Sequence, residues 1–377
     1  MPAQTIVVVF LRGGADGLAL VPPMDDPTLR RLRPTLASRR PIPLGPTLCP
    51  SGETGSCPAE LGLHPELAPL VPAFRAGELA IVHAVGSDDA TRSHFDAQER
   101  MERAGVRAGS EPSGWLARHL RTRVGPEPST LSSVAIGTSV PDSLASAPAV
   151  AVLESVDDLV ASATTRDPAL RRALAALHGD AHDPIHEAGR DAMAAIDRLA
   201  RTRPTRRSRA YGVLPFGRAL AEVARLVRAD VGLEAATIDL GGWDTHLAQS
   251  TALDTPARTL AEGLAAFRAD LGDAMEHVVV VVMTELGRRA YENAALGTDH
   301  GRASVMLLLG GGVRGGRVVT RWPGLDPASL EPPGDLRVTI DYRDVLAELV
   351  GVRLGSTRVG EVFPGWAPGA LGLFGST

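Results

Sequence analysis

The run of five consecutive valines at positions 278–282, in the segment HVVVVVMTELGRR, most constrains the fold of this chain. A strand that is apolar at every position has no face to offer to water, so both of its faces must be covered. Similar short apolar runs occur at Leu79–Ala84 and in QTIVVVF, SSVAIG, EAATIDL and ASVMLLLGGG, and helical patterns separate several of them. This alternation predicts an α/β fold in which helices sandwich a mostly parallel central sheet.

The stretch from residue 157 to residue 233 differs from the rest in composition. It is rich in Ala, Arg, Asp and Leu at helical spacing, and the basic, proline-containing segment RLARTRPTRRSRAYG interrupts it. We interpret residues 157–233 as a helical insertion within one domain that spans residues 1–377.

All 39 basic residues of the chain are arginines. The lack of lysine excludes a P-loop lysine, a pyridoxal Schiff base and a lysine general base. The net charge of -5 gives no reason to expect nucleic acid or an anionic membrane as a partner. The sequence carries no signal for the oligomeric state.

No stretch approaches the roughly 18 continuous apolar residues that span a bilayer, so no membrane span is predicted. The segment TIVVVFLRGG lacks the basic flank of a signal peptide. Cys49 and Cys57 lie in a loop rich in Gly, Pro and Ser. They could form a small disulfide, which would favour an oxidising compartment, whereas two thiols alone make a poor zinc site.

Acids and imidazoles gather in four loops beside predicted strands: Asp16, Asp244 with His246, Glu285, and Asp299 with His300. Active sites of open parallel sheets lie at the carboxyl ends of the strands. Carboxylate oxygens and imidazole nitrogens suit Zn, Mn or Mg, and a bound metal would polarise an ester oxygen or activate a nucleophile. The four loops together therefore favour a divalent metal site.

Each loop also has a purely structural interpretation. An aspartate after a strand commonly caps a helix or stabilises a turn, which applies to Asp16 and Asp244. Glu285 could pair with Arg288 or Arg289, and the Asp299–His300 pair could belong to a turn.

Longer motifs carry a resemblance to a known family. FLRGGADGLALVPP, AIVHAVG, TRSHFDAQE, GGWDTH, MTELGRRAYENAALGTDHGRASVMLLLGGGVRGGRVV, WPGL and TIDYRDVLAELV resemble the bacterial DUF1501 family over nearly the whole chain. That family is grouped with the alkaline phosphatase and sulfatase superfamily. The resemblance implies a mixed sheet between helices, one or two divalent metals (Zn, Mn, Ca or Mg), and a Ser, Thr or formylglycine nucleophile.

The resemblance also suggests roles for individual residues. Asp16 resembles the first-strand metal acid, Asp244 and His246 the next ligand pair, and His300 the late histidine. Ser93 stands where the nucleophile is expected, near a helix N-terminus that would favour an anionic group. His94 is a candidate ligand or acid/base group, and Arg92 and Arg288 are candidates to hold an anionic substrate.

The chain departs from the superfamily at the end of the central strand. TELG offers one carboxylate, Glu285, where phosphatases usually have an Asp-His pair, so the resemblance leaves a second metal in doubt. Asp299 could compensate. No Cys-X-Pro-X-Arg or Ser-X-Pro-X-Arg motif is present, which disfavours a formylglycine sulfatase.

The leading hypothesis is a metal-dependent hydrolase of small phosphate or sulfate esters, in which Ser93 or a metal-bound water attacks. One alternative is a non-catalytic binding or assembly protein that keeps the fold. Another is a metal-free serine hydrolase that uses Ser93 with His246 or His300, although the chain lacks a G-x-S-x-G elbow. The resemblance, together with the cysteine pair, implies a periplasmic or secreted protein.

Overall fold

A ten-stranded sheet forms the centre of the computed structural model, which describes residues 4–45, 47–48, 60–105, 112–123, 128–161, 167–179, 183–202 and 209–375. The strand order is β3-β11-β5-β10-β9-β1-β8-β6-β7, and β12 also pairs with β5. The strands are β1 (Thr5–Leu11), β3 (Thr47–Leu48), β5 (Leu79–Gly86), β6 (Ser133–Ile136), β7 (Ala151–Leu153), β8 (Ala235–Leu240), β9 (Val278–Thr284), β10 (Ser304–Gly310), β11 (Arg317–Val319) and β12 (Ile340–Asp341). A separate short ladder joins β2 (Ile42–Pro43) to β4 (Gly62–Leu63). Cys49 and Cys57 lie outside the described residues.

The valine run forms β9, near the middle of the sheet, where it pairs with β1 and β10. All seven residues of β9 are buried, as a strand covered on both faces requires. β10 is antiparallel to both of its neighbours, β9 and β5, whereas the other pairs in this sheet are parallel. The predicted mostly parallel sheet is confirmed.

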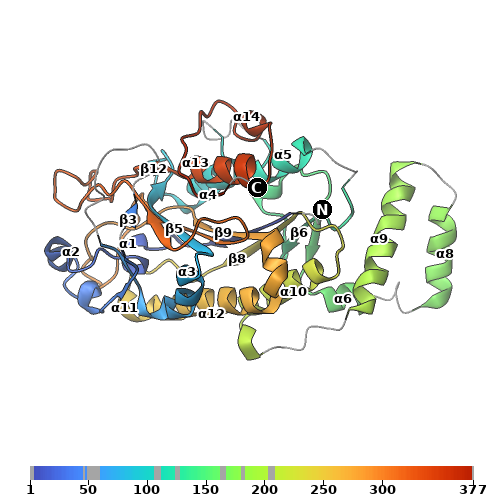
Figure 1. Ribbon diagram of the computed structural model, residues 1–377, viewed down its shortest axis with the longest axis horizontal. Helices are drawn as coiled ribbons and strands as arrows, with labels where there is room; N and C mark the ends of the chain where they lie inside the picture. Colours follow the sequence, from blue (N-terminus) through green and yellow to red (C-terminus); the bar gives the residue numbers. More distant parts are fainter. Residues whose placement is uncertain are drawn as a thin grey trace.

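Helices cover both faces of the sheet (Figure 1). Alternate residues of β1 separate the two layers: Val7 and Val9 belong to one buried cluster, Ile6 and Val8 to the other. The first layer includes α3 (Val71–Arg75), α10 (Pro215–Arg228) and α12 (Asp254–Leu271), and the second includes α4 (His94–Arg103), α5 (Trp115–Thr122), α13 (Tyr342–Glu348) and α14 (Val359–Val362). The other α-helices among the described residues are α1 (Gly17–Leu20), α2 (Pro27–Leu32), α6 (Val156–Ala161), α8 (Pro168–Gly179), α9 (Pro184–Arg201) and α11 (Gln249–Ala252).

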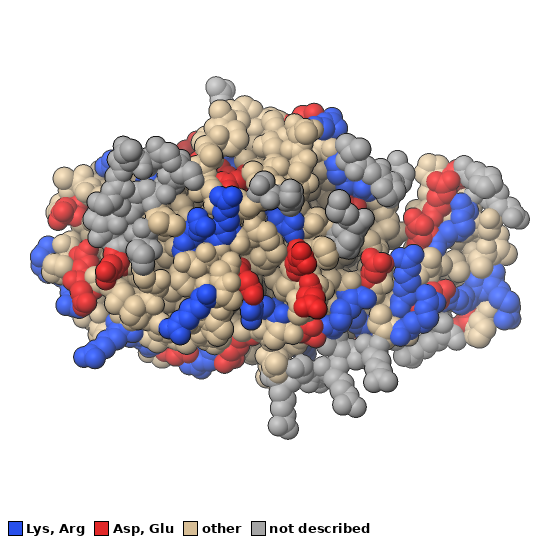
Figure 2. Space-filling view, in the orientation of Figure 1, with Lys and Arg blue, Asp and Glu red and all other residues tan. Residues whose placement is uncertain are grey.

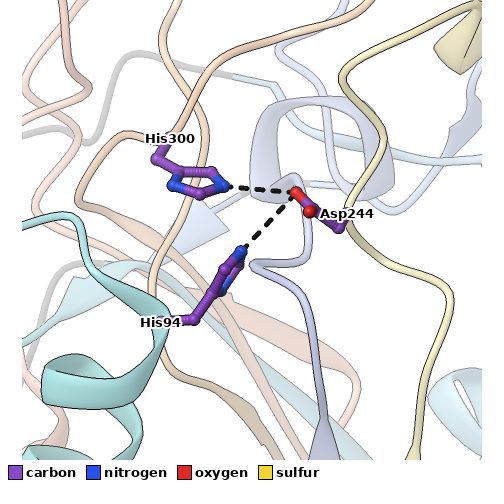
Figure 3. Close-up of side chains that lie close together, drawn as sticks. All are labelled: His94, Asp244 and His300. Atoms are coloured by element: carbon purple, nitrogen blue, oxygen red, sulfur yellow. Dashed lines mark hydrogen bonds and ion pairs between the residues drawn. The ribbon is translucent and has the colours of Figure 1, made fainter.

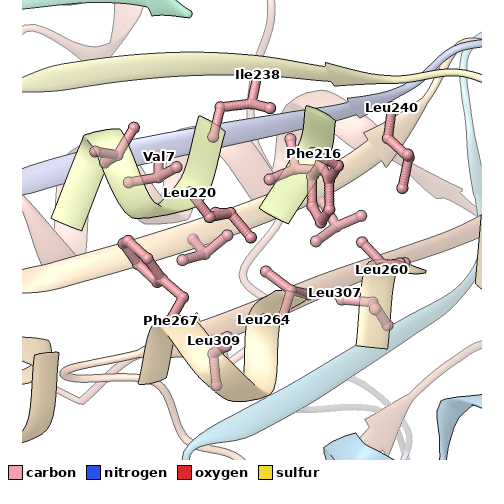
Figure 4. Packing of buried hydrophobic residues seen from close by; sticks show 14 of the residues in the cluster. Val7, Phe216, Leu220, Ile238, Leu240, Leu260, Leu264, Phe267, Leu307 and Leu309 are labelled. Atoms are coloured by element: carbon pink, nitrogen blue, oxygen red, sulfur yellow. The ribbon is translucent and has the colours of Figure 1, made fainter. Parts of the chain in front are cut away.

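The helices between residues 157 and 233 occupy two kinds of place. α8 and α9 lie at one end of the molecule, and α8 buries none of its residues (Figure 1). In contrast, α10 packs Phe216 and Leu220 against Leu264 and Phe267 of α12, beneath the sheet (Figure 4). Each fully buried side chain of this size contributes about 1.5–3 kcal/mol to folding. The region therefore supplies part of one main layer as well as peripheral helices.

The surface carries both signs of charge. Basic and acidic side chains are intermixed over the face in Figure 2. Among the described residues, none of the helices is long and apolar enough to cross a membrane.

Candidate metal centre

Polar loops from four parts of the chain meet at one edge of the sheet, and Figure 3 shows three of their side chains, His94, Asp244 and His300. Asp244 follows β8, Glu285 follows β9, and His94 is the first residue of α4, after β5. His300 precedes β10, and because β10 is antiparallel, its start lies at the edge where its neighbours end. Residues far apart in sequence are therefore brought into contact.

Oδ1 of Asp244 is the point on which three imidazoles converge. It lies 3.0 Å from Nε2 of His246, 3.2 Å from Nε2 of His300 and 3.6 Å from Nε2 of His94. We call these four residues the histidine cluster. Within it, one potential ligand atom each from His94, Asp244 and His300 lie within 4.8 Å of one another, a spacing that a single ion could bridge.

Two of these imidazoles are oriented through their other ring nitrogen. Nδ1 of His94 donates to Oε1 of Glu285 at 2.8 Å, and Nδ1 of His300 donates to the carbonyl oxygen of Arg92 at 3.0 Å. Because a carboxylate and a carbonyl can only accept, these bonds place the proton on Nδ1 and leave Nε2 without one, so that Nε2 is available to coordinate a cation. Metal-binding histidines are oriented in this way in other proteins.

His246 is the most exposed imidazole of the cluster, with 42% of its side chain accessible. Its Nδ1 lies 3.5 Å from Oδ1 of Asp299, and its Nε2 lies 2.9 Å from Nε2 of His300. Since Nε2 of His300 and Oδ1 of Asp244 both accept, Nε2 of His246 must carry a proton. His246 therefore presents a proton donor to the cluster.

The cluster shifts the pKa values of its members in different directions. The hydrogen bond to Glu285 raises the pKa of His94, whereas burial lowers the pKa of His300. Partial burial alone would raise the pKa of Asp244, but the hydrogen bond from Arg288 and the neighbouring imidazoles of His300 and His246 outweigh it and lower that pKa to about 2. The carboxylate of Asp244 is thus ionised at neutral pH.

Glu285, a predicted metal ligand, contacts His94 from within the protein. Its side chain is fully buried, and Oε1 also accepts from the backbone N–H of Gly13 at 2.8 Å and from Nε2 of Gln98 at 3.1 Å. Burial would raise the pKa of Glu285, but its hydrogen bonds, that from His94 foremost, outweigh this and lower it. The carboxylate is therefore an ionised acceptor that orients His94.

Asp16, another predicted ligand, lies in a buried ion pair. Nη1 and Nη2 of Arg33 donate to its two carboxylate oxygens at 2.7 and 3.1 Å, and Nε2 of Gln249 donates to it as well. Asp16 also accepts from the backbone N–H of Ala19, as the N-cap of α1. Both of its oxygens are thus already bonded to protein donors.

The two arginines predicted to hold substrate make extensive contacts within the protein. Arg288 is buried and donates to the carbonyl oxygens of Gly13, Gly14, Trp243 and Thr298 and, at 2.5 Å, to Oδ1 of Asp244. These contacts tie together the loops after β1 and β8 and the loop before β10. The guanidinium of Arg92 binds Asp335 through Nε at 2.8 Å and Nη2 at 2.5 Å.

Ser93 and Asp299 lie beside the cluster. Oγ of Ser93 is the N-cap acceptor of α4, 3.5 Å from the backbone nitrogen of Asp96. Asp299 accepts from Nδ2 of Asn293 at 3.1 Å and faces His246. In this structure Ser93 acts as a helix cap next to His94, and Asp299 as a partner of His246.

Two glycines allow the loops to approach each other this closely. Gly13 has φ +120°, and a Cβ there would lie 2.6 Å from the backbone nitrogen of Asp244. A Cβ on Gly297 would lie 2.2 Å from the carbonyl carbon of His246. Any larger residue at either position would force the loops of the histidine cluster apart.

The residues present fit a divalent metal. Nε2 of His94 is buried without a hydrogen-bond partner, although it faces Asp244. A bound cation would satisfy this nitrogen. A donor set of imidazoles with one carboxylate favours Zn or Mn over Ca and Mg, which prefer oxygen ligands.

The cluster is open to solvent. Half of the Asp244 side chain is accessible. A cavity of about 700 Å³ lies elsewhere, between α2, residues 33–41 and α11, and Gln249 and Arg33 form part of its wall. The exposed side chains of Asp244 and His246 therefore make the cluster accessible from solvent.

Comparison with known proteins identifies the family. Residues 3–358 match the family described as protein of unknown function DUF1501. The chain belongs to the DUF1501 family. The resemblance in its motifs is thus confirmed. No curated protein matches the chain.

Solved structures show only distant likeness to this DUF1501 protein. The lipoteichoic acid synthase LtaP from Listeria monocytogenes has 10% identity over 89% of this chain and 74% of its own, with a TM-score of 0.35. Alkaline phosphatase from the Antarctic bacterium TAB5 has 8% identity over 85% of this chain and 95% of its own, with a TM-score of 0.34. A mutant of that phosphatase, which carries Mg, is 10% identical over the same shares, with a TM-score of 0.35. At such TM-scores the likeness carries no weight for the chemistry of this chain.

Sequence reasoning missed several residues that support the cluster. Gln98 lies four residues after His94, one helical turn on, and this spacing could have indicated their common contact with Glu285. No local signal pointed to Asp335, which is 243 residues from Arg92. Likewise none indicated that Arg33 would neutralise Asp16.

Proposed function

We propose that this protein is a divalent-metal-dependent hydrolase of small anionic esters, with phosphate or sulfate esters as substrates. His94, Asp244 and His300 would hold the metal. One observation carries the proposal: Nε2 atoms of three imidazoles converge on one carboxylate oxygen, and one of these nitrogens is buried without a partner. Membership of DUF1501, a family grouped with metal-dependent phosphatases and sulfatases, supports it.

The protein's residues hold the site ready for a cation. Glu285 and the Arg92 carbonyl keep the protons of His94 and His300 on Nδ1, so that their Nε2 atoms face the centre. Arg288 holds the Asp244 carboxylate in its ionised form. When bound, the metal would polarise the ester oxygen and lower the pKa of a water nucleophile.

His246 would supply the proton in this scheme. Its Nε2 proton faces the same centre, and Asp299, 3.5 Å from Nδ1, would stabilise a positive charge on the ring. We assign His246 as the general acid that protonates the leaving oxygen. The sequence analysis predicted that His246 is a metal ligand. The two roles can be distinguished, because removal of a ligand would release the metal, whereas removal of a general acid would not.

An anionic substrate is favoured by charge and access. The metal and the His246 proton together would place positive charge on the exposed edge of the cluster, next to solvent. A phosphate or sulfate ester could approach from there without displacing buried residues. Export from the cytoplasm, which the family resemblance implies, stays a prediction.

A binding protein without catalysis is the second candidate, and one feature favours it. The carboxylates of Asp16 and Asp244 are each already paired with an arginine, Arg33 and Arg288 respectively. If those ion pairs took the place of bound metals, the protein would keep the fold without hydrolytic activity.

Elemental analysis of protein purified without chelators or a metal-affinity tag tests the proposal. We expect about one equivalent of Zn or Mn, absent from His94→Ala and His300→Ala, together with hydrolysis of aryl phosphates or sulfates that a chelator abolishes. No bound metal after soaking in each ion would refute the metal site and favour the binding protein. Metal without turnover of either ester class would refute the proposed reaction.

A further inference from the structure

The buried carboxylate of Asp335 lies outside the histidine cluster but is connected to it through Arg92. Nε and Nη2 of Arg92 both donate to Oδ2 of Asp335, and Nη2 also donates to the carbonyl of Pro332 at 3.0 Å. The Asp335 side chain has no accessible surface. A buried carboxylate is costly unless it is paired, so this contact is a built feature of the fold.

The backbone of Arg92 has a conformation that a non-glycine residue rarely adopts. Its φ is +56°, in the left-handed region. Such a conformation persists only where surrounding contacts enforce it. The contacts to Asp335 and Pro332 anchor the far end of the Arg92 side chain and so restrain this backbone.

The restrained backbone is the part of Arg92 that reaches the cluster. Its carbonyl oxygen accepts from Nδ1 of His300 at 3.0 Å, and His94 begins α4 only two residues later. A rotation of this peptide would therefore remove the partner of His300 and shift the start of the helix that carries His94.

The turn that carries Asp335 is itself joined to the site. Residues Glu331 and Asp335 exchange backbone hydrogen bonds, and the N–H of Ala290 donates to the carbonyl of Gly334. The segment before Ala290 pairs in turn with the loop of His300, through a bridge between Arg288 and His300. Asp335 is therefore fixed relative to the imidazoles it would help to position.

We propose that Asp335 and Arg92 form a clamp that positions His300, and with it His94, for metal binding. This assigns Arg92 a positioning role in place of the predicted substrate contact. The inference rests on the proposed function, since the cation is the one proposed above. Residues that support metal-binding histidines in this way typically change metal affinity by about 10- to 100-fold when replaced.

Titration of the purified protein with Zn²⁺ tests the clamp in Asp335→Asn, Arg92→Ala and the double variant. We expect each single variant to raise the dissociation constant for Zn²⁺ about 10- to 100-fold. The double variant should bind Zn²⁺ no more weakly than the single variant with the lower affinity, because both substitutions break one contact. Glu331→Gln is the matched control: it removes a carboxylate from the same turn, where it pairs with Arg302, and should bind Zn²⁺ like the wild type.

The ¹⁵N resonances of the His300 ring provide a second readout that needs no metal. In the wild type we expect the proton on Nδ1, and in Asp335→Asn a mixture of tautomers. Unchanged Zn²⁺ affinity and an unchanged tautomer in Asp335→Asn would overturn the clamp. So would an Arg92→Ala variant that raises KM for the ester and leaves Zn²⁺ affinity intact. If the wild type binds no metal, the proposed function fails, and the tautomer alone decides the inference.

Discussion

Replacement of Glu285 by glutamine separates an orienting role from direct metal ligation. The substitution keeps the shape of the side chain and removes its charge. Its oxygen can still accept from Gly13 and from Nδ1 of His94, as Oε1 of Glu285 does at 2.8 Å in both cases. The new amide nitrogen can donate to Oγ1 of Thr284, which itself donates to the carbonyl of Leu11. We therefore expect the variant to fold.

The size of the effect follows from the bond that changes. A hydrogen bond to a charged acceptor contributes about 1.5–3 kcal/mol, and a neutral one about 0.5–1.5 kcal/mol. The difference at His94 is thus roughly 1–1.5 kcal/mol. Since about 1.4 kcal/mol corresponds to a factor of ten, Glu285→Gln should weaken metal binding about tenfold. A ligand lost from the metal itself would cost far more.

Competition with a chromogenic chelator at fixed pH measures this affinity. Glu102→Gln is the control, because it changes another buried glutamate on the helix of His94, where its partner is Arg12. It should leave metal affinity near the wild-type value. An affinity of Glu285→Gln equal to the wild type would refute the orienting role. A loss of about a thousandfold or more would show that Glu285 binds the metal directly, as the sequence first suggested.

Three further outcomes are expected. His246→Ala should retain the metal in elemental analysis and lower kcat by about 10²- to 10⁴-fold, which is the usual contribution of a general acid. Loss of the metal from this variant would show instead that His246 is a ligand. Arg288→Lys should lower the free energy of unfolding by roughly 2–4 kcal/mol in urea denaturation, because lysine cannot reach the carbonyls that the guanidinium satisfies; a stable variant with a raised KM would instead indicate a substrate contact. Burial lowers the pKa of His83 from 6.5 to about 4. His83 therefore contributes its full stability above pH 6.5 and loses it, on the order of 3 kcal/mol, as the pH falls towards 4. In urea denaturation across this range, the free energy of unfolding of His83→Gln should depend less on pH than that of the wild type, and an equal dependence would contradict the assignment.

The strands of the core were predictable because apolar runs in this chain are short and end abruptly. The five valines could only form a strand covered on both faces, and β9 has that environment. The Leu79–Ala84 run became β5, extended by two residues to Gly86. A short apolar run indicates a buried strand from its own residues alone, so the sequence is sufficient to predict such strands.

The convergence of the loops was predictable for a related reason. Asp244 follows β8 and Glu285 follows β9, two parallel strands on either side of β1, and such strand ends meet at one edge of a sheet. For His300 the same expectation needed an additional fact. His300 precedes its strand, so it reaches this edge only because β10 runs antiparallel, and no residue pattern in or around β10 indicates that direction.

The division of roles among these residues was not predictable. Whether a carboxylate binds a cation from solvent or an arginine of its own chain depends on contacts between distant segments. Arg33, which follows α2, contacts Asp16. The carbonyl of Arg92 accepts from His300, which lies 208 residues later in the sequence. Side-chain rotamers and loop paths decide these contacts, and neither leaves a periodic signal.

The pairing of carboxylates with arginines argues for one metal in this chain. A second ion would need its own acids, and the exposed candidate, Asp299, already contacts Asn293 and Arg289. The two buried candidates are engaged as well: Asp16 is neutralised by Arg33, and Glu285 is buried against His94. Opening either contact would leave a buried charge without a partner, at a cost of several kcal/mol. The histidine cluster carries a smaller cost, because Nε2 of His94 has no partner to lose, and Arg288, the partner of the half-exposed Asp244, also donates to four backbone carbonyls. If the proposed function holds, the energetics of the fold therefore favour a single ion at His94, Asp244 and His300, and the remaining carboxylates would anchor the loops that surround it.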